Sequence, residues 1–292
     1  MNSRLTFFPV VFGMLSGVPA MCFRGRFHSY EGHDMKTVVL PVYVMRCLCV
    51  KVVIITNAAG GLNPDLNVGD VVCVSDHLAI PQLAGKNPLV GPNDDELGPR
   101  FPPTSNAYNE DLRMAARNAA KEMGIDFLKT HGTYCFVSGP MYESKAECRF
   151  LRSLGGDSVG MSTIPEVVAA HHCDMQVLCL SLITNKAIME GDEGRPVASH
   201  AEVLEAVAKR SVQMQTLVKG IIKSLQKEVI PNLANLPAVN LNTARLQHQN
   251  TKQEQEDEEN GYKGGISYET LFAGAVLFAA GSLVSGYLNK GR

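Results

Sequence analysis

VKVVIIT, residues 50–56, followed by NAAGG, residues 57–61, is the stretch that decides the fold. Its hydrophobic, mostly β-branched residues do not alternate with polar ones, which is typical of a strand buried on both faces of a sheet. The asparagine and the two glycines then end the strand in a loop, without the spacing of a dinucleotide-binding fingerprint. We therefore predict a central strand that enters a glycine loop.

The segments around this strand alternate between strand and helix patterns. Strands are predicted over residues 70–75, 132–137 and 176–184, a helix over 109–123, and a long amphipathic helix from His200. Alternation of this kind is typical of the α/β class.

Three helix starts, including that of the long helix from His200, have capping-box spelling, in which a Ser or Thr and a Glu three residues later cap each other's backbone N–H groups. The pairs are Ser144 with Glu147, Thr163 with Glu166, and Ser199 with Glu202. Residues 79–107 are rich in Pro, Gly and Asn and lack periodicity, so they are predicted to form a long loop, and such loops are usually functional or disordered.

The composition excludes several classes of protein. A chain of 292 residues that is 45% hydrophobic can bury a sizeable core, which excludes wholesale disorder. A net charge of −2 gives no reason to expect binding to nucleic acid or to an anionic membrane by bulk electrostatics. Along the chain we predict a folded domain over residues 10–227, a polar and acidic linker over 228–265, and an apolar tail over 266–292.

Both ends of the chain are poor in charge. Up to Phe23 the only charged side chain is Arg4, so this segment resembles a signal peptide; the alternative is a pair of short strands, 10–15 and 19–24, with a turn at Ser16-Gly17. Residues 270–289 carry no charge and are long enough for a membrane-spanning helix, with small residues for packing; the alternative is an amphipathic or core helix. A spanning tail would leave the domain cytoplasmic, on a C-terminal anchor.

The eight cysteines do not form a CxxC pair anywhere, so the spacing typical of a zinc site is absent. Most of them lie in apolar segments, and free cysteine prefers protein interiors. We predict buried free thiols in a reducing compartment rather than disulfides.

Polar residues occur where several apolar elements end, and functional side chains commonly gather at such places. Arg26 and His28 could bind an anion together with Ser162 and the N–H groups of a helix start, or they could be a surface pair. Asn185 could be a simple cap, and Glu143 could merely favour a helix N-terminus. The residues alone therefore predict an α/β enzyme that acts on an anionic substrate.

Six stretches together give a much more specific indication. They are GRFHSYEG (25–32), TNAAGGLNPDLNVGD (56–70), GPNDDELGPRFPPTSNAY (91–108), VSGPMYES (137–144), GMSTIPEVVAAHHC (160–173) and SLITNKAI (181–188). In order and spacing they resemble the trimeric class of purine nucleoside phosphorylases, over roughly residues 10–227. The resemblance implies a three-layer α/β fold of the phosphorylase/hydrolase type, in which helices flank a central mixed sheet.

The resemblance also implies the reaction: phosphate cleaves the N-glycosidic bond of inosine, guanosine and their deoxy forms, in purine salvage, to give free base and (deoxy)ribose 1-phosphate. Phosphate would be held by Arg26, His28, the N–H of Ala58, and Ser162. Ribose would contact Tyr30, Met161 and His200. The base would contact Tyr142, Glu143 and Asn185. The catalytic residues would be Asn185, Glu143 and His28.

Further properties follow from the same resemblance. Phe101 would reach into the site of a neighbouring subunit, so the enzyme would act as a homotrimer. No metal ion and no organic cofactor would be required, and inorganic phosphate would be a co-substrate.

The sequence departs from the family at both ends and near His200. The family opens with a strand and a glycine–serine phosphate loop, whereas the match here begins only around Val10, and residues 266–292 are foreign to the family. Residues 190–196 are one residue longer than usual, which affects where His200 is placed. We expect an incomplete gene model, with a natural protein longer than this sequence, or a short form of low activity.

Two alternative functions remain. One is a catalytically impaired, membrane-tethered paralogue that binds a partner or forms mixed trimers. The other is methylthioadenosine phosphorylase, against which Glu143 and Asn185 argue, because that subfamily recognises a 6-amino group with an aspartate in place of Asn185.

Overall fold

The sheet is built around β3 (Val52–Gly61), so the predicted central strand is confirmed. The predicted glycine loop over residues 57–61 is wrong, because these residues continue the strand and pair with its neighbours, and the missing side chains of Gly60 and Gly61 leave room for Asn185 and Ile183. The computed structural model describes residues 9–189, 200–228 and 276–280. Val52 to Thr56 pair in parallel with β9 (Gln176–Lys186) on one side and with β10 (Val276–Ala280) on the other. Every residue from Val52 to Asn57 is buried, which explains why hydrophobic residues follow one another there without alternation.

The rest of the sheet extends from both sides of β3. Beyond β10 lies the hairpin of β1 (Val10–Leu15) and β2 (Val18–Arg24). The far half of β3, at Gly60 and Gly61, pairs antiparallel with β8 (Ser158–Gly160). The strands beyond β8 and β9 complete a mixed sheet of ten described strands: β7 (Thr133–Phe136) and β5 (Asp76–Ala79) beyond β8, and β4 (Val71–Cys73) and β6 (Leu128–Lys129) beyond β9.

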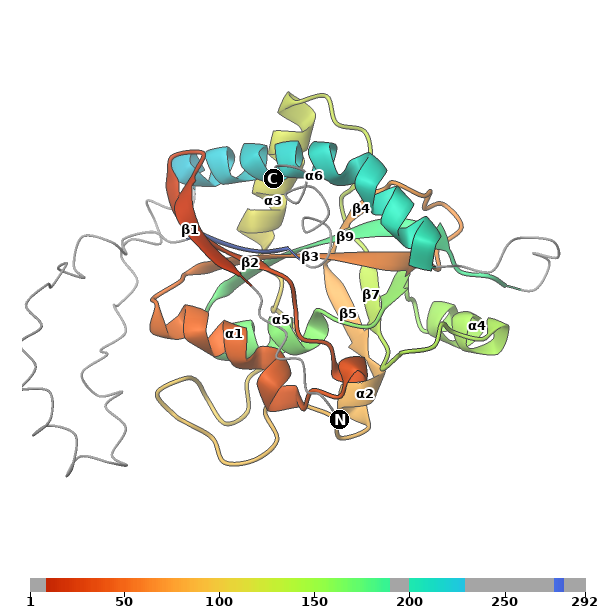
Figure 1. Cartoon of the computed structure of the whole chain (residues 1–292), viewed down its shortest axis with the longest axis horizontal. Coiled ribbons are helices and arrows are strands. Elements are labelled where there is room, and N and C mark those ends of the chain that lie inside the picture. The colour runs from red at the N-terminus through yellow and green to blue at the C-terminus, as the bar shows by residue number, and fades with distance from the viewer. Residues whose placement is uncertain (1–8, 190–199, 229–275, 281–292) are drawn as a thin grey trace, which may run out of the picture.

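Helices cover both faces of this sheet, which gives the three layers that the resemblance implies (Figure 1). On one face lie α1 (Met35–Cys47) and α5 (Ile164–His172), and on the other lie α3 (Glu110–Glu122) and α6 (His200–Glu228). The shorter helices are η1 (Ser29–Glu31), α2 (Ile80–Leu83) and α4 (Lys145–Ser153). A separate hydrophobic core lies on each face, and a smaller cluster packs under α4.

Most predicted local elements are confirmed. The apolar start forms the predicted strand pair, with both turn residues, Ser16 and Gly17, at positive φ. Asn109 caps α3 by accepting from the Leu112 N–H at 2.9 Å. Residues 84–106 contain neither a helix nor a strand, as predicted for the long loop, whereas its first residues form the end of β5 and α2.

Two of the three capping boxes fall on described residues, and one of those predictions is wrong. Ser144 and Glu147 cap α4 reciprocally, as predicted. Thr163 makes no side-chain cap at α5, and its φ is +78°. Glu166 does accept from the Thr163 N–H, so only half of the box forms, and its carboxylate also accepts from Arg26 Nε at 2.7 Å. The third box begins at Ser199, outside the described residues.

The tail departs from the prediction of a membrane-spanning helix over residues 270–289. Residues 276–280 form β10, a strand inside the sheet, and the rest of that segment lies outside the described residues. A central strand and a membrane span both require an uncharged apolar sequence, so hydropathy alone did not separate them. Among the described residues, every helix is too short or too polar to cross a bilayer.

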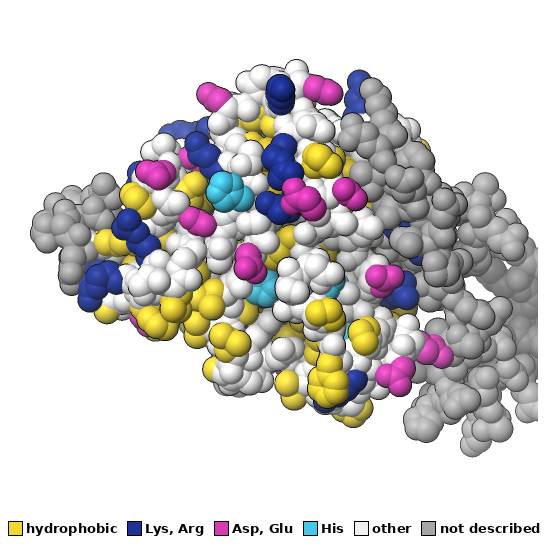
Figure 2. All heavy atoms as spheres, turned by 180° about the vertical axis from the view of Figure 1, so that it is seen from behind, with side chains coloured by type: hydrophobic (Ala, Val, Ile, Leu, Met, Phe, Trp, Pro, Cys, Tyr) yellow, Lys and Arg dark blue, Asp and Glu magenta, His cyan; other side chains and the backbone are white. Residues whose placement is uncertain are grey.

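The surface charges are distributed as the small net charge predicts, and the cysteines are free thiols as predicted. On the face in Figure 2, basic and acidic side chains of the described residues are interspersed rather than gathered into a patch of one sign. All eight cysteines are free thiols. Five of them are buried, as predicted: Cys73, Cys135, Cys148, Cys173 and Cys179. The prediction of burial is wrong for the other three, since Cys22 and Cys49 are half-buried and Cys47 is exposed.

Candidate active site

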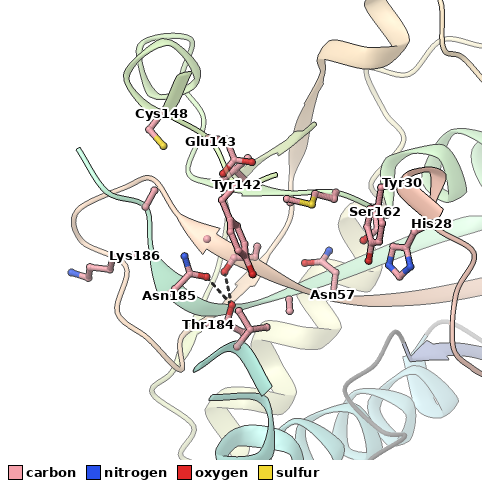
Figure 3. Close-up of a pocket in the computed structure, with 18 of the residues that line it drawn as sticks. His28, Tyr30, Asn57, Tyr142, Glu143, Cys148, Ser162, Thr184, Asn185 and Lys186 are labelled. Atoms are coloured by element: carbon pink, nitrogen blue, oxygen red, sulfur yellow. Dashed lines mark hydrogen bonds between the residues drawn. The ribbon is translucent and has the colours of Figure 1, made fainter. Parts of the chain in front are cut away.

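A cavity of about 200 Å³ lies where β2, β3, β8 and β9 end. Nine of the predicted site residues line it, although they come from five separate parts of the sequence. They are Arg26, His28, Tyr30, Ala58, Tyr142, Glu143, Met161, Ser162 and Asn185. Figure 3 shows His28, Tyr30 and Ser162 on one side of this pocket, and Tyr142, Glu143 and Asn185 on the other.

Arg26 follows β2 and is almost fully buried, with 7% of its surface exposed. Its Nε donates to Glu166 Oε2 at 2.7 Å, and Nη2 donates to the Thr56 carbonyl at 3.1 Å. Nη1 lies 3.4 Å from Ser162 Oγ, on the pocket side. These contacts hold the guanidinium in one orientation, so its positive charge faces the cavity in a place from which water is largely excluded.

Glu166 is the residue that the sequence interpretation missed. It is buried in α5, and burial raises the pKa of its carboxyl group, while the Arg26 guanidinium and the Thr163 N–H oppose that rise. An acidic residue three positions into a helix is normally expected to cap it, so only the distance in space to Arg26 could identify this pair. Loss of either partner would leave the other buried charge uncompensated.

His28 lies beside Arg26 and is oriented by its neighbours. Its ring stacks on Tyr30 with 4.6 Å between ring centroids, and its Nδ1 lies 3.3 Å from Glu31 Oε2. Burial, and next the charge of Arg26, lower the pKa of His28 below its usual 6.5, against the opposing effect of Glu31. The imidazole is therefore neutral at pH 7, so one ring nitrogen can donate while the other accepts.

Asn57, in the middle of β3, is held by buried side chains of neighbouring elements. Its amide Nδ2 donates to Thr163 Oγ1 at 3.0 Å, and its Oδ1 accepts from Ser181 Oγ at 2.6 Å. All three side chains are buried and come from β3, β9 and the start of α5. Asn57 thus links β3 and β9, which carry Ala58 and Asn185, to Thr163, the residue next to Ser162.

A register shift in the sheet determines how Asn185 is presented. Ala59 pairs with Ile183 and Gly60 pairs with Asn185, so Thr184 is an extra residue in β9, in a β-bulge. The Thr184 hydroxyl lies 3.1 Å from Asn185 Oδ1 and 3.3 Å from the Ala59 carbonyl, so its one hydrogen is shared between these two acceptors (Figure 3). Because the amide oxygen is engaged, the Nδ2 group remains available as a donor toward the pocket.

Tyr142 and Glu143 come directly before α4 and occupy the same end of the cavity as Asn185. Burial raises the pKa of Glu143 above its usual value, its own backbone N–H opposes this, and the charge of Glu147 raises it further. A partly buried carboxyl group and an amide donor thus face one end of the cavity. Arg26, His28 and Ser162 face the other.

Two predicted site residues are not placed in the cavity. Phe101 lies in the long loop with 86% of its surface exposed and does not line the pocket. His200 begins α6, and its side chain lies outside the described residues. In the described part of the chain, no group of His, Cys, Asp and Glu side chains is arranged to hold a metal ion.

Known proteins are similar to this chain in sequence and in fold. The sequence model of the Phosphorylase superfamily matches residues 2–223. The purine nucleoside phosphorylase of Bos taurus is 46% identical over 216 residues, which cover 74% of each chain.

Two solved structures extend the likeness. A purine nucleoside phosphorylase of Schistosoma mansoni in complex with inosine is 45% identical with a TM-score of 0.73, covering 76% of this chain and 78% of that one. A purine nucleoside phosphorylase in complex with ribose 1-phosphate is 44% identical with a TM-score of 0.67, covering 73% and 74%. By fold and by sequence, the chain belongs to the purine nucleoside phosphorylases of the Phosphorylase superfamily.

Proposed function

We propose that the chain catalyses phosphorolysis of 6-oxopurine nucleosides, namely inosine, guanosine and their deoxy forms. The division of the cavity supports this most strongly: one end carries Arg26, neutral His28 and Ser162, which suit phosphate, and the other carries Glu143 and Asn185. A carboxylate can accept from the N1–H of a 6-oxopurine, and an amide Nδ2 can donate to N7. The relatives that were solved with inosine and with ribose 1-phosphate bind ligands of this kind.

The reaction needs the groups that each end supplies. A phosphate oxygen forms a bond to C1′ as the C1′–N9 bond breaks, through an oxocarbenium-like state, and the bonding pair leaves with the purine. Negative charge that develops on the imidazole ring of the base is met by the Asn185 amide, and the phosphate dianion favours the cationic sugar. We propose phosphate as the co-substrate, with no metal ion and no organic cofactor.

We also propose roles for the residues that line the middle of the cavity. Tyr30 and Met161, together with His200, would contact the ribose, and Tyr142 would pack on the base. Phe101 would complete the site of the next subunit in a homotrimer. Free base and ribose 1-phosphate as products correspond to a role in purine salvage.

The test is phosphate-dependent release of base by the purified full-length chain. Inosine and guanosine should be cleaved with kcat/KM at least tenfold above that for adenosine and methylthioadenosine, and EDTA should have no effect. Asn185→Ala should lower kcat on the order of 10²–10³-fold, by analogy with lost oxyanion donors. Hypoxanthine release that does not depend on phosphate, or a preference for methylthioadenosine, would contradict the proposal, and no release at all would indicate an inactive paralogue.

A further inference from the structure

The strand β10 occupies an unusual place for the end of a chain. In the sheet it lies between β2 and β3, with Val276 to Ala280 paired to Ala20–Arg24 on one side and to Val52–Thr56 on the other. Both ladders are parallel and run through the whole of β10. Figure 1 shows this strand, in dark blue, within the sheet and between its helical layers.

The neighbours of β10 require a strand in that position. On one face of the sheet Met21, Val53 and Ile55 are buried, and on the other face Ile54 is buried. The backbone groups of β2 and β3 that point toward β10 therefore lie in the protein interior. Buried backbone N–H and C=O groups need partners, and an empty slot between two central strands would leave a row of them unpaired. An uncharged sequence such as VLFAA can fill that slot without burying a charge.

We propose that the C-terminal segment Val276–Ala280 is an obligatory central strand of the catalytic sheet, donated by the chain's own tail. The tail is therefore part of the folded enzyme rather than an addition to it. This inference does not depend on which nucleoside the enzyme cleaves.

The position of α6 favours donation within one chain. Ser16, in the turn that precedes β2, donates from its hydroxyl to the Lys219 carbonyl at 3.0 Å, and the amide of Gln226 lies against Gly17. The last helix thus ends near the start of β2, where β10 also begins its pairing at Ala20. Residues 229–275 could reach on the order of 150 Å if fully extended, so the connection is far longer than this path requires.

The strand also lies beside the anion-binding end of the cavity. Ala280 is in register with Arg24 and with Thr56, each two residues before a residue that lines the pocket, Arg26 or Ala58. The bond from Arg26 Nη2 to the Thr56 carbonyl joins the segment that follows β2 to the middle of β3 at that level. Without β10, the spacing between those two strands, and hence between Arg26 and Ala58, would not be fixed.

The register can be tested with a cysteine already in the chain. Phe278 is paired with Cys22, and paired residues of neighbouring strands point to the same face at about 4.8 Å, within the range that a disulfide spans. In Phe278→Cys, mild oxidation should give an intramolecular disulfide to Cys22, found by peptide mapping under non-reducing conditions. The matched control is Leu277→Cys, whose thiol points to the opposite face, and it should give at least tenfold less of that product.

Two outcomes of this experiment would overturn the proposal. Equal cross-linking of both variants to Cys22 would mean that the tail is not held in this register. A disulfide-linked dimer as the main product of Phe278→Cys would mean that the strand comes from a second copy of the chain. Neither readout requires activity, so failure here is distinct from failure of the proposed reaction.

A proline tests whether the strand is obligatory. Ala279→Pro removes one ladder donor from β10 in the full-length chain, whereas Ala238→Pro places the same residue in the connection before it. Ala279→Pro should lower Tm by at least 5 °C or prevent folding, and any folded fraction should show a raised KM for phosphate. If Ala279→Pro has the same Tm and the same KM for phosphate as Ala238→Pro, β10 is dispensable and the proposal is wrong.

Discussion

At the scale of single residues, the active site depends on groups that orient the proposed catalytic side chains. Arg26 is held by Glu166, His28 by Glu31 and Tyr30, and Asn185 by Thr184. The site residues that face the cavity could be named from the sequence. Their supports could not, because Glu166 lies 140 residues from Arg26 and only the fold brings the two charges to 2.7 Å.

Thr184→Val tests the orientation of Asn185. Valine keeps the shape of threonine but cannot donate to Asn185 Oδ1, so the amide is no longer fixed with its Nδ2 toward the cavity. We expect kcat for inosine to fall about tenfold, the equivalent of one hydrogen bond, with a smaller change in KM. Thr184→Ser keeps the hydroxyl and should restore most of the rate. An unchanged kcat in the valine variant would show that Asn185 is held by other contacts.

Glu147→Gln tests the electrostatics of Glu143. The glutamine can still cap α4, but the charge that helps to raise the pKa of Glu143 is gone. The pKa of Glu143 should therefore fall, and the acid limb of kcat/KM should move to lower pH, by on the order of a few tenths of a unit, since Glu147 is exposed and screened.

The measurement is the ratio of kcat/KM between variant and original enzyme across the acid range, because this ratio cancels the titration of phosphate itself. The ratio should exceed one only at acid pH and return to one at high salt. Glu122→Gln, far along the sequence in α3, serves as the control. A shift of the acid limb to higher pH would contradict the assigned cause.

At the scale of secondary-structure elements, most helices and strands begin and end where the local sequence predicts, and the exceptions lie at the active site. Asn109 and Ser144 cap their helices as their sequences predict. Thr163 does not, because its hydroxyl accepts from Asn57 and its backbone has a positive φ beside Ser162. The extra residue in β9, Thr184, likewise had no signal in the sequence, since a bulge is defined only by the partner strand.

Ser144→Ala tests the capping of α4. The change removes the acceptor of the Glu147 N–H and should destabilise the protein by about 1 kcal/mol, measured as the free energy of unfolding in urea. Because Tyr142 and Glu143 directly precede this cap, KM for inosine should rise as well. Ser153→Ala, in the last turn of the same helix, should change the free energy of unfolding by less than about 0.5 kcal/mol. Equal effects of the two changes would mean that the box does not contribute.

At the scale of the whole molecule, Phe101 tests the proposed trimer. The side chain is almost fully exposed in the single chain, so Phe101→Ala should leave the free energy of unfolding of the isolated chain within about 0.5 kcal/mol. If Phe101 completes a neighbour's site, the variant should raise KM for inosine several-fold while sedimentation still shows a trimer. Leu83→Ala, another exposed apolar residue, is the control. An unchanged KM would leave Phe101 outside the site.

The sequence by itself determined the family, the central strand and nine of the residues that line the cavity. It could do so because strand burial follows from hydrophobic pattern and because family motifs keep their order along the chain. Only the tertiary structure decided what the apolar tail does. An apolar segment such as residues 276–280 is more stable away from water, but its sequence does not determine whether it is buried in a lipid bilayer or in a protein core. The backbone groups of β2 and β3 that need a partner are brought side by side only when the sheet forms. Pairing with them is what makes residues 276–280 of the tail a strand.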